Sequence, residues 1–303
     1  MRLVTRSDFD GLVTAVLLKK LEMIEEIKFV HPKDMQDGTV AITNNDILTN
    51  VPFVAGCGLW FDHHASEVKR AQEEKFDYKG EVRIADSAAR VVYEYYGGKE
   101  KFGPFFDNIM EGVDKADAAK FSDSDILNPE GWDLLSFVMD SRTGLGRFRD
   151  FRISNYQLME KLVELCLHKN IDQIMLDEDV KERVDRYFEL DVPFREMLAA
   201  HTRIEGNVIV TDLRNVEQIY PGNRFLIYAL HPEQNVSLWI VDGFQKQNCA
   251  IACGHSIVNR TCEVPVGYLM REFGGGGHEA AGTCQVSYEK ADDVIAQLIE
   301  RFN

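Results

Sequence analysis

The chain has 303 residues, 45% hydrophobic and 28% charged, a composition typical of a folded globular protein of about two domains rather than a disordered or fibrous one. It has no run of about 18 uncharged apolar residues and no signal-peptide-like N-terminus, so we expect a cytoplasmic protein with no membrane partner. The formal charge of −16 argues against binding of long duplex nucleic acid, because that binding depends on surface lysines and arginines.

The first half of the sequence alternates strand-like and helix-like segments. Apolar runs predict strands at residues 2–5, 27–30, 40–43 and 59–62. Apolar residues at helical spacing predict helices at residues 12–23, 88–96, 105–118, 132–141 and 153–168. This alternation is typical of an α/β domain with a mostly parallel sheet, in which ligands bind at the carboxyl ends of the strands. We assign residues 1–170 to this domain.

The second half has a different pattern. Residues 171–204 are charged and rich in helix formers, which predicts a helical connector. Short β-type runs follow at residues 208–211, 225–230, 238–241, 250–253 and 283–287, with helices at 265–273 and from residue 289 onwards. Residues 205–303 are therefore predicted to form a second, smaller α/β domain.

The sequence Asp-Phe-Asp-Gly at residues 8–11 joins the first predicted strand to the first predicted helix. Carboxylates at positions i and i+2, here Asp8 and Asp10, can converge on one hard cation, and the glycine allows a tight turn. A turn that merely caps the helix accounts for the same residues equally well.

Asp62, His63 and His64 stand at the end of the predicted strand at residues 59–62. Burial of a carboxylate beside two imidazoles is costly unless a metal ion or hydrogen bonds compensate for it. We therefore favour a ligand site over a solvated loop at this position.

Four consecutive glycines at residues 274–277 precede His278. Such a run loses much chain entropy on ordering, so a folded protein keeps it where the backbone must approach something closely. We predict that its amides, leading into a helix of small residues, cradle an anion to which His278 donates a hydrogen bond. A flexible linker is the alternative.

Taken in order, these motifs resemble those of the DHH phosphoesterase superfamily, which includes RecJ-type exonucleases, nano-RNases and exopolyphosphatase-like proteins. The resemblance covers nearly the whole chain and rests on residues 8–11, residues 62–64, the helix-borne Asp114 and residues 274–282. It implies an N-terminal DHH domain that holds divalent ions and a C-terminal DHH-associated domain that binds substrate.

The resemblance also implies roles for individual residues, carried over by position. The implied metal ligands are Asp8, Asp10, Asn50, His63 and Asp114. The implied catalytic residues are Asp62, which would orient its neighbours, and His64, which would face a phosphate oxygen or the leaving group. Arg6 is added to them although it departs from the family pattern. The implied substrate contacts are Asn259, Arg260, Gly275, Gly276, Gly277 and His278. Arg142 is added because an arginine would offset charge on the phosphoryl group, with an ordinary surface role as the alternative.

Two positions depart from the family pattern. Arg6 and Val4 stand where many relatives carry a histidine, and neither side chain can replace that ligand. The second-motif acid is matched most closely by Asn50, with Asp46 as the alternative. We therefore predict one tightly bound ion, together with either a second ion that binds only with substrate or Arg6 as a fixed positive charge beside the phosphate.

The predicted reaction is hydrolysis of a small phosphorylated substrate, such as a short oligonucleotide, a nucleotide or polyphosphate, by metal-activated water. The resemblance implies Mn²⁺, and Mg²⁺ is the alternative, because carboxylates and one imidazole suit either ion. A cation is expected since carboxylates that meet within ~4 Å repel by about 4 kcal/mol per pair at an effective dielectric near 20. Asp10→Ala is expected to abolish hydrolysis and leave the fold intact.

Two other hypotheses stay open at this stage. The main one is a noncatalytic nucleotide-binding or sensor protein with an eroded metal site, which turnover of a model phosphodiester would exclude. The third is an interaction protein that assembles through its acidic helices, and a homodimer is compatible with all three.

Overall fold

The computed structural model describes residues 1–303, which divide into two compact units. The first unit comprises Met1–Lys120 and Pro129–Arg186, and the second comprises Phe121–Asn128 and Tyr187–Asn303. The boundary falls inside the long helix α11 (Glu178–His201), within the segment predicted as a helical connector. Neither this helix nor any other combines the length and the apolar character that a membrane span requires.

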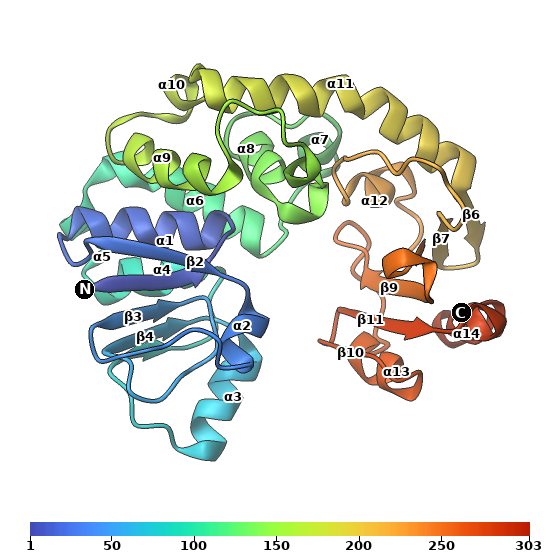
Figure 1. Cartoon of the computed structure of the whole chain (residues 1–303), viewed down its shortest axis with the longest axis horizontal. Helices are drawn as coiled ribbons and strands as arrows, with labels where there is room; N and C mark the ends of the chain where they lie inside the picture. Colours follow the sequence, from blue (N-terminus) through green and yellow to red (C-terminus); the bar gives the residue numbers. More distant parts are fainter. The chain divides into compact units, whose positions relative to one another are not determined.

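A five-stranded, all-parallel sheet forms the centre of the first unit (Figure 1). In spatial order its strands are β2 (Glu26–Val30), β1 (Arg2–Arg6), β3 (Asp46–Thr49), β4 (Leu59–Asp62) and β5 (Gly80–Val82). Strand β2 lies on one side of β1, and strand β3 lies on the other. Such a reversal of strand order is where open parallel sheets bind ligands. The predicted α/β class with a mostly parallel sheet is confirmed.

The sheet has a separate hydrophobic core on each face, because side chains alternate across a strand. Leu3 and Ile47 are fully buried in the core that includes helix α1 (Phe9–Lys20). Val4 and Leu48, each one residue further along, are buried in the core on the other face. Helix α1 is buried along its first ten residues, so its carboxylates enter the protein interior.

Nine helices and three short 3-10 segments complete the first unit. They are α1, α2 (Pro32–Gln36), α3 (Ala65–Glu74), α4 (Ala88–Tyr95), α5 (Gly98–Phe102), η1 (Pro104–Phe106), α6 (Asp107–Asp117), α8 (Gly131–Met139), η2 (Ser141–Thr143), η3 (Leu145–Arg147), α9 (Asn155–His168) and α10 (Ile171–Met175). Two of their N-caps lie at the site described below: the Asp8 side chain accepts from the Gly11 amide, and the Ser87 side chain accepts from the Arg90 amide.

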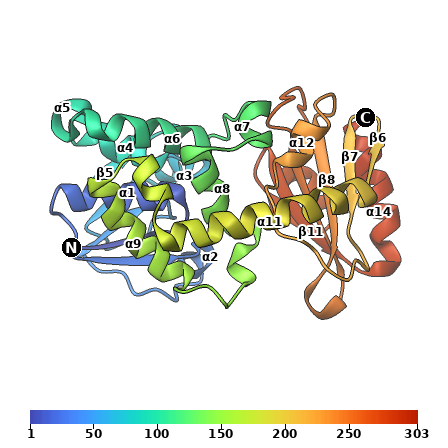
Figure 2. The same cartoon turned by 90° about the horizontal axis from the view of Figure 1, so that it is seen from above.

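The second unit is built on a six-stranded sheet in which only β7 and β8 pair in parallel. Its strands, in spatial order, are β10 (Gly276–Gly277), β11 (Ala281–Val286), β9 (Cys249–His255), β8 (Val236–Asp242), β7 (Val208–Asp212) and β6 (Thr202–Glu205). Its helical segments are α7 (Asp123–Leu127), part of α11, α12 (Leu226–Leu230), η4 (Phe244–Lys246), α13 (Val266–Glu272) and α14 (Tyr288–Phe302). Helices α13 and α14 share a hydrophobic core with the strands, and Figure 2 shows α14 alongside them.

Two predicted strands are wrong. Residues 40–43 form no strand, and the third strand of the first sheet lies at Asp46–Thr49 instead. Residues 225–230, predicted as a strand, contain the short helix α12. Both errors concern short apolar runs, whose periodicity does not distinguish strands from buried helical turns or loops.

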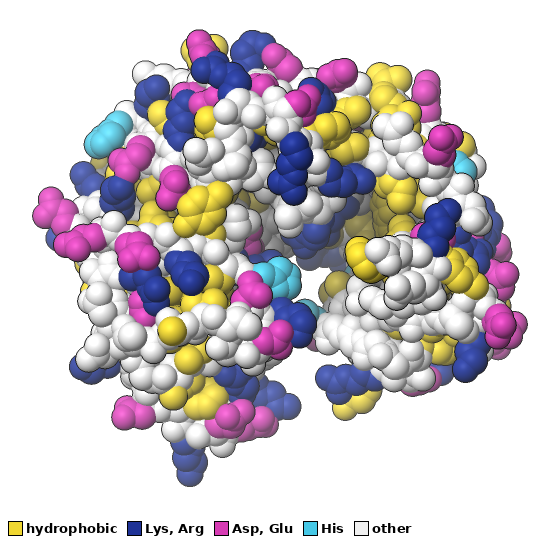
Figure 3. Space-filling model, in the orientation of Figure 1, with side chains coloured by type: hydrophobic (Ala, Val, Ile, Leu, Met, Phe, Trp, Pro, Cys, Tyr) yellow, Lys and Arg dark blue, Asp and Glu magenta, His cyan; other side chains and the backbone are white.

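Acidic and basic side chains are interspersed over the face of the molecule shown in Figure 3. Pairs four residues apart on helices contribute to this pattern, including Lys33 with Asp37 and Lys181 with Asp185. Exposed pairs of this kind contribute at most about 1 kcal/mol each, so they decide solubility more than fold.

Candidate active site

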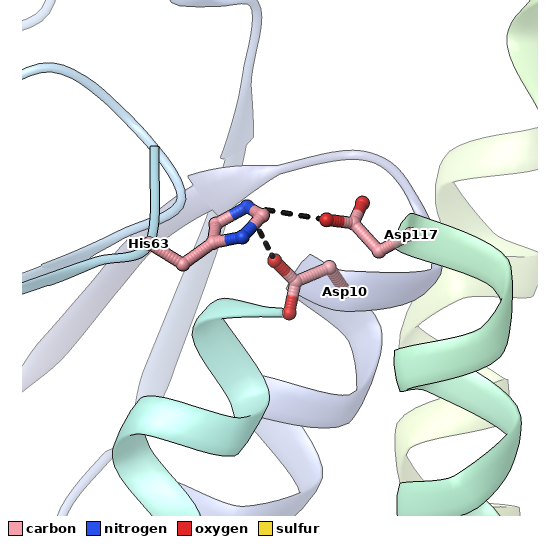
Figure 4. A group of neighbouring side chains, drawn as sticks. All are labelled: Asp10, His63 and Asp117. Carbon is pink, nitrogen blue, oxygen red and sulfur yellow. Dashed lines mark ion pairs between the residues drawn. The ribbon is translucent and has the colours of Figure 1, made fainter. Parts of the chain in front are cut away.

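Three side chains meet beyond the carboxyl end of the parallel sheet in the first unit (Figure 4). Asp10 lies in the first turn of α1, His63 follows β4, and Asp117 is the last residue of α6. Each offers a ligand atom, and these atoms all lie within 4.8 Å of one another. The Nε2 atom of His63 is 3.1 Å from an Asp117 carboxylate oxygen and 3.8 Å from an Asp10 oxygen.

Asp10 is held by the start of another helix. Its two carboxylate oxygens accept hydrogen bonds from the Ala88 and Ala89 amides, at 2.9 and 2.7 Å, in the first turn of α4. The positive end of the helix dipole favours this negative charge. Burial nevertheless raises the pKa of the Asp10 carboxyl above its ordinary value, although His63 acts in the opposite direction. The carboxylate is therefore fixed in place but not fully compensated.

The ring of His63 is oriented by a main-chain carbonyl. Its Nδ1 atom lies 3.1 Å from the Ala85 carbonyl oxygen, which can only accept, so Nδ1–H donates this hydrogen bond. In the neutral ring the lone pair is then on Nε2. That Nε2 atom is buried and has no hydrogen-bond partner. A buried imidazole nitrogen that faces two carboxylates without a hydrogen bond is the geometry expected of a metal ligand.

Asp117 joins the group in place of the expected Asp114. The Asp114 carboxylate instead accepts from the Ser87 hydroxyl at 2.7 Å and pairs with the Arg90 guanidinium on α4. Burial, with the neighbouring Asp10 and Asp8 carboxylates, raises the pKa of Asp117 well above its usual range. Both acids stand near the end of α6, three residues apart and so on a similar face, which is why the spacing alone did not separate them.

The donor set fits a divalent cation. Two carboxylates and one imidazole supply the oxygen and nitrogen ligands that Mn²⁺ or Mg²⁺ accepts, and no thiol belongs to the group. One ion at this point would compensate the charges of Asp10 and Asp117. It would also give the Nε2 atom of His63, which has no hydrogen-bond partner, a cation to bind.

Asp62 and His64 form a second pair beside this group. One Asp62 oxygen accepts from the His64 amide at 2.7 Å and lies 2.8 Å from its Nδ1 atom. Asp62 is fully buried and its other oxygen has no partner, whereas the His64 side chain is about one-third exposed. The arrangement turns Nε2 of His64 away from Asp62, where it can serve a substrate.

Asp8, Arg6 and Asn50 lie together at the ends of β1 and β3. An Asp8 oxygen is 3.1 Å from Nε of Arg6, and the other accepts from the Asn50 side-chain amide at 3.2 Å. The alternative Asp46 is excluded from this position because it begins β3, level with Arg2 in the sheet, and pairs with the Arg2 guanidinium.

Arg142 lies in η2, with an exposed side chain hydrogen-bonded to Asp140 at 2.8 Å. Desolvation lowers the pKa of Arg142, but this hydrogen bond and the nearby Asp8 and Asp117 carboxylates raise it overall. Its charge therefore acts on Asp117, which belongs to the candidate ion site, and on the neighbouring Asp8.

The glycine run in the second unit forms a hairpin rather than a loop before a helix. Gly276 and Gly277 form β10 and pair with β11, and residues 278–280 are the turn. The amides of Gly275 and His278 donate to the carbonyls of Met270 and Ala281, so they are not free to cradle an anion. The side chain of His278 is exposed at the turn.

Asn259 and Arg260 lie in the segment that follows β9. The side chain of Asn259 donates to the Glu233 carbonyl at 2.8 Å and accepts from the Thr261 hydroxyl at 2.7 Å. Arg260 is exposed, and its Nε donates to the Ile257 carbonyl at 3.1 Å. Asn259 is thus engaged in shaping its own loop.

The hairpin predicts a sharp difference between two neighbouring glycines. A Cβ atom on Gly275 would lie 2.0 Å from the Thr283 carbonyl oxygen, whereas one on Gly276 would meet nothing within 4 Å. We expect Gly275→Ala to lower the free energy of unfolding by about 2–4 kcal/mol and Gly276→Ala to change it by less than about 0.5 kcal/mol. Urea denaturation of both variants tests this, and equal stabilities would contradict the hairpin.

No protein-family profile matches the sequence, and no curated protein matches it. Among solved structures, the chain is similar to the pGpG-specific phosphodiesterase PggH from Vibrio cholerae, with 50% identity and a TM-score of 0.88 over 100% of this chain and 98% of that one. CDC45 from Entamoeba histolytica shares the fold, with 9% identity and a TM-score of 0.52 over 99% and 95% of the chains. RecJ from Thermus thermophilus in complex with Mn²⁺ aligns to all of this chain and 52% of its own, with 13% identity and a TM-score of 0.48.

Proposed function

The chain belongs to the DHH phosphoesterase superfamily, and from that premise we propose that it is a phosphodiesterase that hydrolyses linear dinucleotides of the pGpG type. Membership makes it a metal-dependent hydrolase of small phosphorylated substrates. The observation that carries the finer proposal is the 50% identity to PggH over the full length of both chains. Hydrolysis of the single bridging diester in such a substrate releases two mononucleotides.

Asp10, His63 and Asp117 are the residues that would hold the divalent ion. When bound, the ion would act as a Lewis acid that activates water and polarises the phosphoryl oxygens. The chain's own contribution is positional: the α4 amides fix Asp10, and the Ala85 carbonyl fixes the tautomer of His63. Both ligands are thus held in place before the substrate arrives.

We propose that His64 is the residue that donates a proton during the reaction. Asp62 accepts from the Nδ1 atom of this ring, so a doubly protonated His64 would donate its Nε2 proton to the leaving oxygen, or a hydrogen bond to the phosphate, and would keep its Nδ1–H on Asp62. The one-third exposure of the His64 side chain gives the substrate access to it. Asp62, which touches no substrate in this scheme, acts through His64.

Phosphate binding is assigned to arginines of the first unit and to the second unit. Arg142 stands close enough to Asp8 and Asp117 for their charges to raise its pKa, which supports its placement beside the reacting phosphate. For the second unit we keep Arg260 and His278 as the proposed substrate contacts. The engagement of the hairpin amides favours the exposed side chains of Arg260 and His278 over those amides.

We further propose Mn²⁺ as the preferred ion, one tight ion site, and a cytoplasmic location. The mixed carboxylate and imidazole donors support Mn²⁺ over Mg²⁺, because imidazole is the softer ligand. The six free cysteines support a reducing compartment. A homodimer stays a prediction.

A substrate panel tests the proposed function. The purified chain with Mn²⁺ is offered pGpG, pApA, longer oligonucleotides, cyclic di-GMP and polyphosphate, and the products are separated by ion-exchange chromatography. We expect two equivalents of GMP from each pGpG and slower cleavage of the other substrates. Cleavage of polyphosphate or long oligonucleotides in preference to every dinucleotide would overturn the proposal.

A further inference from the structure

Asp8 is already satisfied by the chain, although it lies beside the ion-binding group. One of its oxygens accepts from the Gly11 amide at 2.9 Å and from the Asn50 amide at 3.2 Å. The other lies 3.1 Å from Nε of Arg6. A carboxylate that is paired with a guanidinium in this way has its charge met without a metal ion.

Asn50 is buried beside Asp8 in a conformation that suits its residue type. It is 1% exposed and has a φ of 54°, a left-handed conformation that asparagine and aspartate adopt more readily than other non-glycine residues. Its side-chain Nδ2 faces Asp8, and its Oδ1 atom is buried without a partner. An amide can donate to Asp8, whereas an aspartate at this position would add a negative charge and call for another cation.

The charges of the site balance with one ion. With an ion bound, Asp10 and Asp117 as its ligands and Asp8 as the partner of Arg6 would carry three negative charges. The Arg6 guanidinium and one divalent ion together supply three positive charges. Arg142 is paired with Asp140, so that pair adds no net charge.

From these contacts we propose that Arg6 is the site's second cation, fixed by Asp8 and Asn50, and that its terminal nitrogens bind a non-bridging phosphate oxygen of the substrate. This inference rests on the proposed function only for the identity of the substrate. Arg6 contacts Asp8 through Nε, and its side chain is about one-third exposed, so the two Nη atoms are available to a ligand. A guanidinium presents them in a fork that matches a phosphate.

Ion counting tests the proposal independently of turnover. Metal-free wild-type chain is titrated with Mn²⁺ by isothermal calorimetry, and bound Mn²⁺ is examined by electron paramagnetic resonance. We expect one ion per chain and the six-line spectrum of an isolated ion. Two tightly bound ions with a spin-coupled spectrum would overturn the proposal.

A double variant tests whether Arg6 and Asn50 set this number. Arg6→His with Asn50→Asp replaces the fixed cation with a ligand and the amide with a carboxylate. We expect this chain to bind two Mn²⁺ ions and to show the coupled spectrum. If the double variant folds and still binds one ion, Arg6 and Asn50 do not determine the number of bound ions.

The single variant Arg6→Ala tests the phosphate contact and avoids the risk of misfolding in the double variant. We expect it to keep one Mn²⁺ ion and to raise the KM for pGpG at least about tenfold, with Arg6→Lys intermediate. An unchanged KM would contradict the contact. If the wild-type chain binds one ion but does not cleave pGpG, the proposed substrate is wrong and the one-ion proposal stands. If it cleaves pGpG and binds two ions tightly, the proposed substrate stands and the one-ion proposal is wrong.

Discussion

Asp117→Asn is expected to weaken Mn²⁺ binding at least about 100-fold and to lower kcat/KM for pGpG by at least the same factor. The loss of an outer partner of a ligand already costs about 10–100-fold in metal affinity, so the loss of a ligand costs more. Asp117 supplies an oxygen 3.1 Å from Nε2 of His63, and an amide there carries no charge to offset the ion. Calorimetric titration and steady-state kinetics measure the two effects.

Asp114→Asn is the matched control, because Asp114 lies on the same helix and is an equally conspicuous acid in the sequence. Its carboxylate serves Arg90 and Ser87 instead of the ion group. We expect metal affinity and kcat/KM to stay within a few-fold of wild type, with a loss of about 1 kcal/mol of stability from the partly exposed pair. If Asp114→Asn loses the metal and Asp117→Asn keeps it, the assignment is reversed.

The same two variants differ in their thermal response to the ion. A ligand that binds only the folded state stabilises it by RT ln(1 + [L]/Kd), about 2.7 kcal/mol at 100 times Kd. Wild type and Asp114→Asn should therefore melt at a higher temperature when Mn²⁺ is added. For Asp117→Asn, with a Kd about 100-fold higher, the same ion concentration contributes only about 0.4 kcal/mol, so its melting temperature should change little.

The parallel sheet was predictable because each early strand is followed by a helix or a turn with its own sequence signal. The third strand was not, since residues 40–43 carry a stronger β-type run than Asp46–Thr49. What places β3 is its pairing with β1, in register from Arg2 opposite Asp46, and the ion pair between those two residues. Such a contact spans 44 residues and leaves no local trace in the sequence.

Local signals likewise account for two of the three residues in the candidate ion site. Asp10 and His63 were predictable because each directly follows a strand, where side chains converge at one edge of a parallel sheet. The choice between Asp114 and Asp117 depends on Arg90, which lies on a different helix and takes one of the two acids out of the site. The glycine run was misjudged for the same reason, because its amides are engaged by a hairpin partner that periodicity does not reveal.

Asp10→Ala is expected to abolish metal-dependent hydrolysis and also to destabilise the first unit, whereas the sequence alone predicts an intact fold. The Asp10 carboxylate accepts from two buried amides, those of Ala88 and Ala89, in the first turn of α4. Each buried donor left without a partner costs about 1–3 kcal/mol. Burial of the carboxylate itself opposes folding, as the raised pKa of Asp10 indicates, and this offsets part of the loss.

We therefore expect the free energy of unfolding of metal-free Asp10→Ala to fall by about 1–4 kcal/mol, measured by urea denaturation with a chelator present. Asp10→Asn is the control, because its side-chain oxygen still accepts from one of the two amides. It should recover part of the stability and none of the activity, which separates the capping role of Asp10 from its role as a ligand. Equal stability of wild type and Asp10→Ala would show that the α4 amides find other acceptors, and the helix start would then not depend on the site.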